Sequence, residues 1–558
     1  MNFLIKQISP LEKIRCAADL SCNELRTKTV LAGERVGYQI SVVSDSYLDL
    51  DISVESELAE CVKLYSVNDA VMDTPVTFSD LDKEAEDYLS YEPGMMPDIL
   101  IPLEEQRNKT SVAANGKPNT IWVRVDVPED TKAGVYPVTV TYSALTNYTT
   151  ASNPFRVSVT MNIEVISAVI PPQKLIYTRW FHADCIADYH KVEVYSERHW
   201  ELIEKYIATA VDTGINMILV PVHTPPLDTA IGTRRTCVQL VDITKNGELY
   251  EFHFDKFHRF IEICKKCGVK YYEIAHMFSQ WGAKCAPNIM VTENGVKDYL
   301  FGWHVAADSE MYTNFLKQYI AAISKQLELE GINENTYFHI SDEPKLDTIE
   351  TYRRASNLIR PLLKGSKTFD ALSQYTFYEQ GLIECPVTAV NHIGPFLEHD
   401  IPNQWAYYCI SQQRLVTNSF LANPSYRTRI AGFQMYRYHI KGFLQWGYNY
   451  YNSRVSLYPV NPYLTTSGGG TYPSGDGFNV YPGQDTVYTS IRSEVFYDAL
   501  QDIRICEALE ALIGRAAVEQ MIDDAAGYQI TFDKYPRGNQ FQESLRAAMI
   551  ARIKELSK

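Results

Sequence analysis

Asn335-Thr336-Tyr337-Phe338-His339-Ile340-Ser341-Asp342-Glu343-Pro344 is the stretch around which the rest of the chain is organised. Residues that favour β-structure precede two adjacent carboxylates, and Pro344 then stops backbone pairing. In an ideal strand Asp342 and Glu343 face opposite sides, so both enter one site only if the strand ends and the chain turns there. The simple alternative is an acidic turn before the helix predicted to follow.

The surroundings of this stretch favour a site over a simple turn. From Lys174 onward strands are predicted at 175–181, 216–222, 269–274, 336–341, 367–372, 387–392, 405–410 and 442–446. Helices are predicted at 197–212, 255–266, 310–329, 349–363, 426–440 and 490–512. Eight strands alternating with helices are typical of a (β/α)8 TIM barrel, whose catalytic residues lie at the C-terminal ends of the strands. Asp342 and Glu343 come at such an end.

The N-terminal part of the chain has a different pattern. Short segments that alternate apolar with polar residues are separated by Gly, Asp and Asn turns, as in residues 120–127 and 134–142. This pattern predicts a β-sandwich. Ile170-Pro171-Pro172 marks a boundary, because consecutive prolines end the last strand. We therefore predict a β-sandwich accessory domain at 1–168 and a catalytic barrel with C-terminal helices at 169–558.

The composition is that of a globular protein of two or three domains, with 558 residues, 46% hydrophobic and 22% charged. A net charge of -16 argues against nucleic-acid and anionic-membrane partners. No run approaches the roughly 18 apolar residues of a membrane span, and no signal peptide is evident. The 11 cysteines are odd in number and scattered, which favours reduced thiols and a cytoplasmic location.

Aromatic and hydrogen-bonding side chains gather at the predicted strand ends. A sugar ring needs such a setting, because its faces are apolar and its rim carries hydroxyls. The sequence therefore predicts a carbohydrate substrate. The candidate substrate-binding residues are Trp180, His182, His276, Trp281, Trp303, His339, His392, Trp405, Trp446, Tyr448 and Asn449.

Two cofactor-dependent alternatives have weaker support. His182, His223 and His276 at three strand ends suggest a metal-dependent barrel hydrolase, but no His-x-His signature accompanies them. The glycine run at 468–470 lacks the strand-to-helix setting and the basic partner of a phosphate-binding loop. We predict neither a metal nor another cofactor.

With these residues assembled, the chain resembles the family 123 glycoside hydrolases and the wider group that carries the domain of unknown function 4091. The N-terminal β region also looks like the domain usual in that group. The matching stretches are YTRWFHADCIA (177–187), IAHMFSQWGAK (274–284), YFHISDEP (337–344), GFLQWGYN (442–449), GDGFNVYPG (475–483) and SIRSEVFYDALQD (490–502).

The resemblance implies retaining hydrolysis of a terminal β-linked 2-acetamido sugar, N-acetyl-β-galactosamine in the founding activity. It also implies substrate assistance, in which the acetamido oxygen attacks C1 and forms an oxazolinium. By this resemblance Glu343 is the general acid that later activates water, and Asp342 orients the acetamido N–H and stabilises the positive charge.

Two alternatives remain open from the residues. A retaining glycosidase with two protein carboxylates would use Glu343 as acid and Asp370 or Glu273 as nucleophile, on a sugar without an acetamido group. A non-catalytic carbohydrate-binding protein would use the aromatic residues alone, although a lectin has no need of adjacent acids at a strand end.

Overall fold

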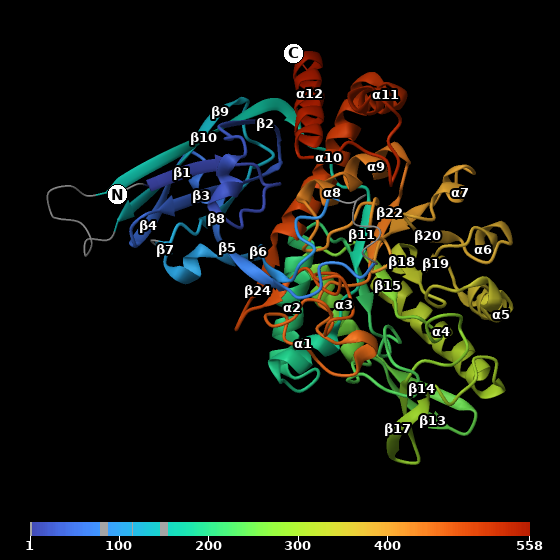
Figure 1. The fold of residues 1–558 in the computed structure, drawn as a ribbon. Coiled ribbons are helices and arrows are strands. Elements are labelled where there is room, and N and C mark those ends of the chain that lie inside the picture. Colours follow the sequence, from blue (N-terminus) through green and yellow to red (C-terminus); the bar gives the residue numbers. More distant parts are fainter. Residues whose placement is uncertain (1–2, 79–86, 114, 145–154, 558) are drawn as a thin grey trace.

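The computed structural model describes residues 3–78, 87–113, 115–144 and 155–557. Two β-sheets form the N-terminal part, and a closed barrel of eight parallel strands with surrounding helices follows (Figure 1). The predicted fold class, a β-sandwich followed by a (β/α)8 barrel, is confirmed.

The two N-terminal sheets are built from antiparallel strands, apart from one parallel pair, β2 with β10. The first sheet contains, in spatial order, β1 (Phe3–Ile8), β3 (Arg35–Ser44), β8 (Asn119–Asp126), β5 (Val62–Met72), β6 (Gly94–Pro102), β24 (Val487–Ser490) and β23 (Tyr481–Pro482). The second contains β2 (Thr27–Ala32), β10 (Arg156–Val169), β9 (Gly134–Ala144), β4 (Leu48–Glu55) and β7 (Lys109–Val112).

The sandwich core follows the two-residue period of its strands. Strand β3 contributes Val36, Tyr38, Ile40 and Val42 to one buried cluster, and β8, β9 and β10 contribute every second residue in the same way. Strands β23 and β24 come from the far C-terminal side of the chain and extend the first sheet. The division into two domains at residue 168 stays a prediction.

The barrel strands lie close to the predicted positions, with ends that differ by up to three residues. They are β11 (Ile176–Arg179), β12 (Met217–Val220), β15 (Tyr271–Ile274), β18 (Thr336–Phe338), β19 (Lys367–Leu372), β20 (Cys385–Ala389), β21 (Trp405–Tyr407) and β22 (Gly442–Gln445). All are parallel, and pairing of β11 with β22 closes the barrel.

The helices also follow the sequence signals. They are α1 (Ala183–His190), α2 (Glu197–Asp212), α3 (Asp255–Cys267), α4 (Glu310–Glu330), α5 (Ile349–Ile359), α6 (Thr376–Glu379), α7 (Gly394–Leu397), α8 (Ser425–Arg429), α9 (Ala431–Arg437), α10 (Ile491–Ile513), α11 (Arg515–Ala526) and α12 (Gln540–Leu556). Ser196 and Ser309 cap α2 and α4 by accepting hydrogen bonds from backbone N–H groups of the first turn. The single helix expected at 426–440 is divided into α8 and α9.

A four-stranded sheet was not predicted. It consists of β14 (Leu249–His253), β13 (Asp242–Asn246), β16 (Ile289–Glu293) and β17 (Val296–Phe301), and it lies in segments between barrel strands and helices. An Asn-Gly pair marks each of its two hairpins, at Asn246-Gly247 and Asn294-Gly295. Asn294 and Gly295 both have positive φ, of 52° and 79°, as a two-residue hairpin turn requires. This turn signal was available in the sequence.

Ion pairs made by two buried arginines join the sandwich to the barrel. Arg124 of β8 makes two hydrogen bonds of 2.6 Å to the carboxylate of Asp212 at the end of α2. Arg492 of α10 binds Asp98 of β6 and also donates to the carbonyl oxygens of Gly475 and Phe478, at 2.5 and 3.0 Å. Arg492 thus fixes the long segment after β22 that reaches the site described next.

Two further observations concern the helices and the thiols. Among the described residues, no helix is both long and apolar enough to span a membrane. All 11 cysteines are free thiols.

Candidate active site

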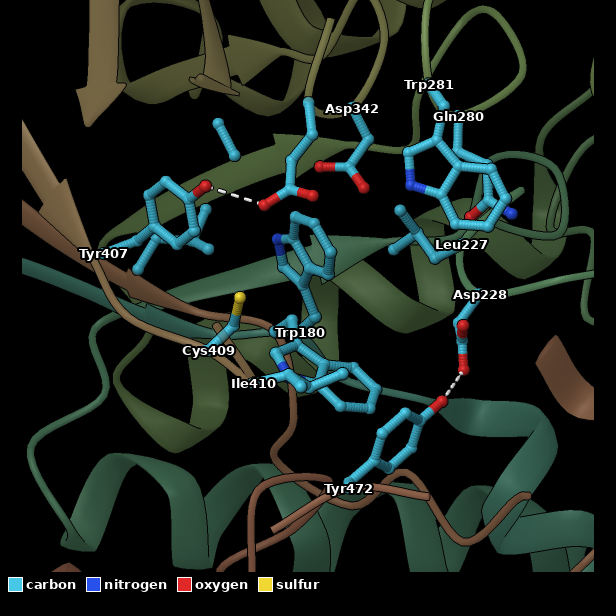
Figure 2. A pocket seen from close by; sticks show the side chains of 14 residues that line it. Trp180, Leu227, Asp228, Gln280, Trp281, Asp342, Tyr407, Cys409, Ile410 and Tyr472 are labelled. Atoms are coloured by element: carbon cyan, nitrogen blue, oxygen red, sulfur yellow. Dashed lines mark hydrogen bonds between the residues drawn. The ribbon is translucent and has the colours of Figure 1, made fainter. Parts of the chain in front are cut away.

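A cavity opens at the C-terminal ends of the barrel strands (Figure 2). Its lining residues lie in or after strands β11, β12, β15, β18, β19, β21 and β22, which places them all at one mouth of the barrel. They are Trp180, Leu227, Asp228, Gln280, Trp281, Asp342, Glu343, Ala371, Tyr407, Cys409, Ile410, Leu444, Trp446 and Tyr472.

Asp342 and Glu343 both line this cavity because the strand ends before them. Strand β18 ends at Phe338, and His339 and Ile340 still bond the backbone of the segment after β15 before the chain turns at Asp342 and Glu343. Glu343 adopts a left-handed φ of 40°, an uncommon conformation for a residue with a side chain. Its N–H donates to Ala371 O at 3.1 Å, and Asp342 O accepts the N–H of Trp281 at 2.8 Å. The turn that the sequence required is therefore present, and backbone hydrogen bonds hold it on both sides.

The two carboxylates have different partners. Tyr407 donates its hydroxyl to Oε1 of Glu343 at 2.6 Å, and burial raises the pKa of Tyr407 well above its usual range, so this hydroxyl stays protonated. Burial and then the neighbouring Glu343 carboxylate raise the pKa of Asp342 well above its usual range. The Asp342 carboxyl therefore loses its proton less readily than an ordinary aspartate.

A buried charge network lies beneath the pair. His339 is fully buried between Glu273, 3.0 Å from its Nε2, and Asp370, 3.2 Å from its Nδ1. Burial opposes the positive charge, but the hydrogen bonds to the two carboxylates raise the pKa of His339 to about 9. His339 is therefore an imidazolium at neutral pH.

This network supports two parts of the cavity. Asp370 accepts the N–H groups of Ile340 and Ser341, at 3.0 and 3.2 Å from its nearest oxygens, which fixes the chain just before Asp342. Glu273 accepts the indole N–H of Trp180 at 3.2 Å. Neither Glu273 nor Asp370 lines the cavity, and both are fully buried. Both carboxylates have His339 as a partner in this arrangement.

Within the described chain, one group of buried side chains has the chemistry of metal ligands, but its contacts do not suit a metal. Ligand atoms of His276, His339 and Asp370 lie within 4.8 Å of one another. Both nitrogens of His339 are hydrogen-bonded to carboxylates, however, and the rings of His276 and His339 are stacked 3.8 Å apart. A metal ligand needs a free lone pair in the ring plane, which His339 lacks. The Nε2 atom of His223 lies 2.9 Å from His276 O. The two ring nitrogens of His182 contact Arg235 and the carbonyl oxygen of Trp446, so His182 and His223 do not share a site with the other histidines.

Three of the predicted substrate-binding residues line the cavity: Trp180, Trp281 and Trp446. Trp281 is 42% exposed and has a positive φ of 60°. Trp446 donates its indole N–H to the buried Asp476 at 2.9 Å, which fixes its ring. Burial raises the pKa of Asp476 to about 7.

The other predicted residues do not line the cavity, for separate reasons. Trp405 packs inside the barrel against Tyr337 and Phe369, because it begins β21 and the C-terminal end of that strand is Tyr407. Two hydrogen bonds join the Asn449 side chain to the His182 backbone, and Tyr448 donates to Tyr206 O. His276 and His339 are buried beneath the cavity, and His392 lies on an exposed turn. Trp303 lies away from the cavity and donates its indole N–H to Thr233 O.

Sequence reasoning missed several lining residues, notably Asp228, Gln280, Tyr407 and Tyr472. Tyr407 could have been found, because it shares a strand face with Trp405 and lies nearer the C-terminal end. Asp228 and Tyr472 lie in irregular segments without a periodic pattern, so only the folded structure brings them together.

Comparison with known proteins places the chain in a family. The model of the glycoside hydrolase 123 catalytic domain matches residues 180–509, more than half of the chain. No curated protein matches the sequence.

A solved structure supports the fold. A family 123 glycoside hydrolase from Clostridium perfringens, described in work on glycolipid glycan hydrolysis, aligns with a TM-score of 0.70 at 15% identity, covering 99% of this chain and 98% of that chain. A xylanase of family 10 with a bacterial Ig-like domain, from termite gut, aligns with a TM-score of only 0.33 at 8% identity, over 86% of this chain and 100% of that chain. On the family match, with a two-part fold shared along almost the whole length of the Clostridium structure, the chain belongs to glycoside hydrolase family 123.

Proposed function

We propose that this glycosidase removes a terminal β-linked 2-acetamido sugar, N-acetylgalactosamine, by retaining and substrate-assisted catalysis. The acetamido oxygen of the sugar attacks C1 and forms an oxazolinium. Glu343 protonates the leaving oxygen and later activates water, while Asp342 accepts the acetamido N–H and stabilises the positive charge.

One observation carries this proposal. Asp342 and Glu343 share one cavity, whereas Glu273 and Asp370, the nucleophiles of the two-carboxylate alternative, are buried and bonded to His339. A retaining enzyme with a protein nucleophile needs a second carboxylate about 5 Å across the ring from the acid. Neither of these two acids can take that position, and a substrate that carries its own nucleophile does not need it.

The adjacent positions of Asp342 and Glu343 suit the two roles. Two adjacent carboxylates in a half-buried site share one proton more readily than they carry two charges. The Tyr407 hydroxyl occupies Oε1 of Glu343 and leaves Oε2 to hold the proton that a leaving group needs. Trp180, Trp281 and Trp446 offer apolar surface for the faces of a sugar ring.

A terminal 2-acetamido sugar of this kind lies at the end of a glycan chain. The Clostridium relative is described in the context of glycolipid glycan hydrolysis. We extend only the class of substrate, a glycan with a terminal 2-acetamido sugar, to this chain.

A panel of nitrophenyl glycosides tests the proposal. We expect cleavage of the β-linked N-acetylgalactosaminide, weaker cleavage of the β-linked N-acetylglucosaminide, and none of the plain β-galactoside or the α-linked controls. A thiazoline analogue of the oxazolinium should inhibit strongly, because it resembles the intermediate in shape and charge. Efficient cleavage of the plain β-galactoside without thiazoline inhibition would contradict the proposal.

A further inference from the structure

Asp228 is a third carboxylate on the wall of the cavity. It lies in the segment after β12 and is half-buried. The Ser456 hydroxyl donates to its carbonyl oxygen at 2.7 Å, and the N–H of Ala230 donates to Val455 O at 2.9 Å. These bonds fasten the Asp228 segment to the long segment after β22.

The two oxygens of the Asp228 carboxylate have unequal surroundings. Oδ2 accepts the hydroxyl of Tyr450 at 2.8 Å, the N–H of Val455 at 3.0 Å and the hydroxyl of Tyr472. No hydrogen bond reaches Oδ1 from the described residues. Figure 2 shows the oxygen that bonds Tyr472 at the bottom of the carboxylate and the other oxygen directed up the cavity wall, on the side of Leu227 and Trp281. A carboxylate oxygen held in this way is a ready hydrogen-bond acceptor for a ligand.

The charges around the cavity point to the same ligand class. Of the 14 lining residues in the described chain, three are acidic and none is Lys or Arg. A sugar that carries a sulfate or a carboxylate would meet uncompensated like charge there. A neutral sugar, or one that develops positive charge during reaction, would not.

We infer that Asp228 is a specificity-determining residue: its Oδ1 accepts a hydrogen bond from a hydroxyl on carbon 4 or carbon 6 of the terminal sugar, and its charge excludes sulfated and uronic sugars. The inference rests on the proposed function, because the reacting end of the sugar then lies at Asp342 and Glu343. Asp228 lines the wall from a different segment than Asp342 and Glu343 (Figure 2), and the inference places beside it the hydroxyls on carbons 4 and 6, which are remote from the reacting carbon 1.

Asp228→Asn is the discriminating substitution. The amide oxygen can still accept the bonds from Tyr450, Val455 and Tyr472, which turns the amide NH2 toward the cavity. The variant therefore keeps the loop and removes both the acceptor and the charge. With the nitrophenyl 2-acetamido glycoside we expect kcat/KM to fall roughly 10- to 100-fold, the range for a hydrogen bond to a charged group.

Deoxy substrates separate recognition from loop structure. One deoxy glycoside, at carbon 4 or at carbon 6, lacks the hydroxyl that Asp228 recognises. On that substrate the kcat/KM values of wild type and Asp228→Asn should differ by no more than about threefold, because the hydrogen bond that the substitution removes is already absent. The other deoxy glycoside should keep the full loss, which identifies the hydroxyl. An equal loss on the parent and on both deoxy glycosides would overturn the inference.

Ser456→Ala is the matched control. It loosens the same junction at the Asp228 carbonyl and removes a 2.8 Å contact with the Tyr450 hydroxyl, but Ser456 touches neither the carboxylate itself nor the cavity lining. We expect it to change kcat/KM by the same factor on all three substrates. The charge is tested with a 6-O-sulfated glycoside, on which Asp228→Asn should exceed wild type, and no gain would overturn the exclusion of anionic sugars.

Failure of the proposed function is distinguishable from failure of this inference. The comparison is run on whichever nitrophenyl glycoside the wild-type enzyme cleaves. If that substrate is a plain glycoside without an acetamido group, the proposed function is contradicted, and the role of Asp228 is still tested. If Asp228→Asn abolished turnover on every substrate and azide restored it, Asp228 would be a nucleophile, and both would be wrong.

Discussion

The hydroxyl of Tyr407 donates to Oε1 of Glu343 at 2.6 Å, so a side chain at the end of β21 orients the proposed acid at the end of β18. The contact crosses the cavity mouth and fixes the carboxyl of Glu343 toward one side. A proton donor works only when it points at the leaving oxygen.

Tyr407→Phe removes this hydrogen bond and keeps the ring. We expect kcat/KM to fall roughly 10- to 100-fold on an alkyl or sugar leaving group and much less on dinitrophenyl, because an activated leaving group needs little protonation. Steady-state kinetics on the two substrates check this. An equal loss on both would mean that Tyr407 acts on something other than the acid.

Glu343→Ala and Asp342→Asn are expected to fail in different ways. Glu343→Ala should lower kcat/KM roughly 10²- to 10⁴-fold on a natural sugar linkage. On an activated aryl glycoside it should lower the rate of intermediate formation only a little, because that leaving group needs little protonation. Asp342→Asn should lose roughly 10²- to 10³-fold on both, because the oxazolinium forms in each case and loses its charge partner. Pre-steady-state kinetics separate the steps, and identical profiles for the two variants would contradict the assigned roles.

His339 links the stability of the barrel to pH. Its pKa in the folded protein, about 9, lies above the ordinary value near 6.5, because Glu273 and Asp370 face it. Its protonation therefore contributes stability that is fully present below about pH 6.5 and is lost as pH rises through about 9, a difference of roughly 3 kcal/mol. His276 and Asp342 also lie close enough to affect its charge.

We expect the melting temperature of the wild-type protein to fall between pH 7 and pH 10 and that of His339→Gln to depend much less on pH. His339→Gln should also be less stable at pH 7, since it leaves two buried carboxylates without their cation. Differential scanning fluorimetry across the pH range measures both. Parallel curves for the two proteins would show that His339 is not the titrating group.

Local signals in the sequence predict much of this fold. The alternation of strand and helix patterns gave the bounds of α2 and α4 to within one residue, and the strand-end position predicted that Asp342 and Glu343 reach one cavity. The two hairpins carry a signal in the sequence, because an Asn-Gly pair between short alternating segments favours a two-residue turn. The surroundings of Asp228 were not predictable: Tyr450 and Tyr472 are more than 200 residues away in the chain and meet it only after the barrel has closed.

Two tryptophans show that the sequence does not separate core positions from cavity positions. Trp405 and Trp446 look alike in sequence, as each lies within a predicted strand or at its end. Trp405 fills the barrel interior, whereas Trp446 lines the cavity with its indole N–H on Asp476. One or two residues along a barrel strand decide between core and site, and strand ends are the least predictable part of a sequence-based assignment.

In the proposed reaction the substrate provides its own nucleophile, and a series of fluorinated substrates can establish this. Nitrophenyl glycosides that carry N-acetyl, N-fluoroacetyl, N-difluoroacetyl and N-trifluoroacetyl groups differ in the electron density of the amide oxygen and little in size. If that oxygen attacks C1, kcat/KM should fall steeply with each added fluorine, because a poorer nucleophile raises the barrier of the bond-forming step. Rates that stay level across the series would contradict the account and assign the attack to a group of the protein.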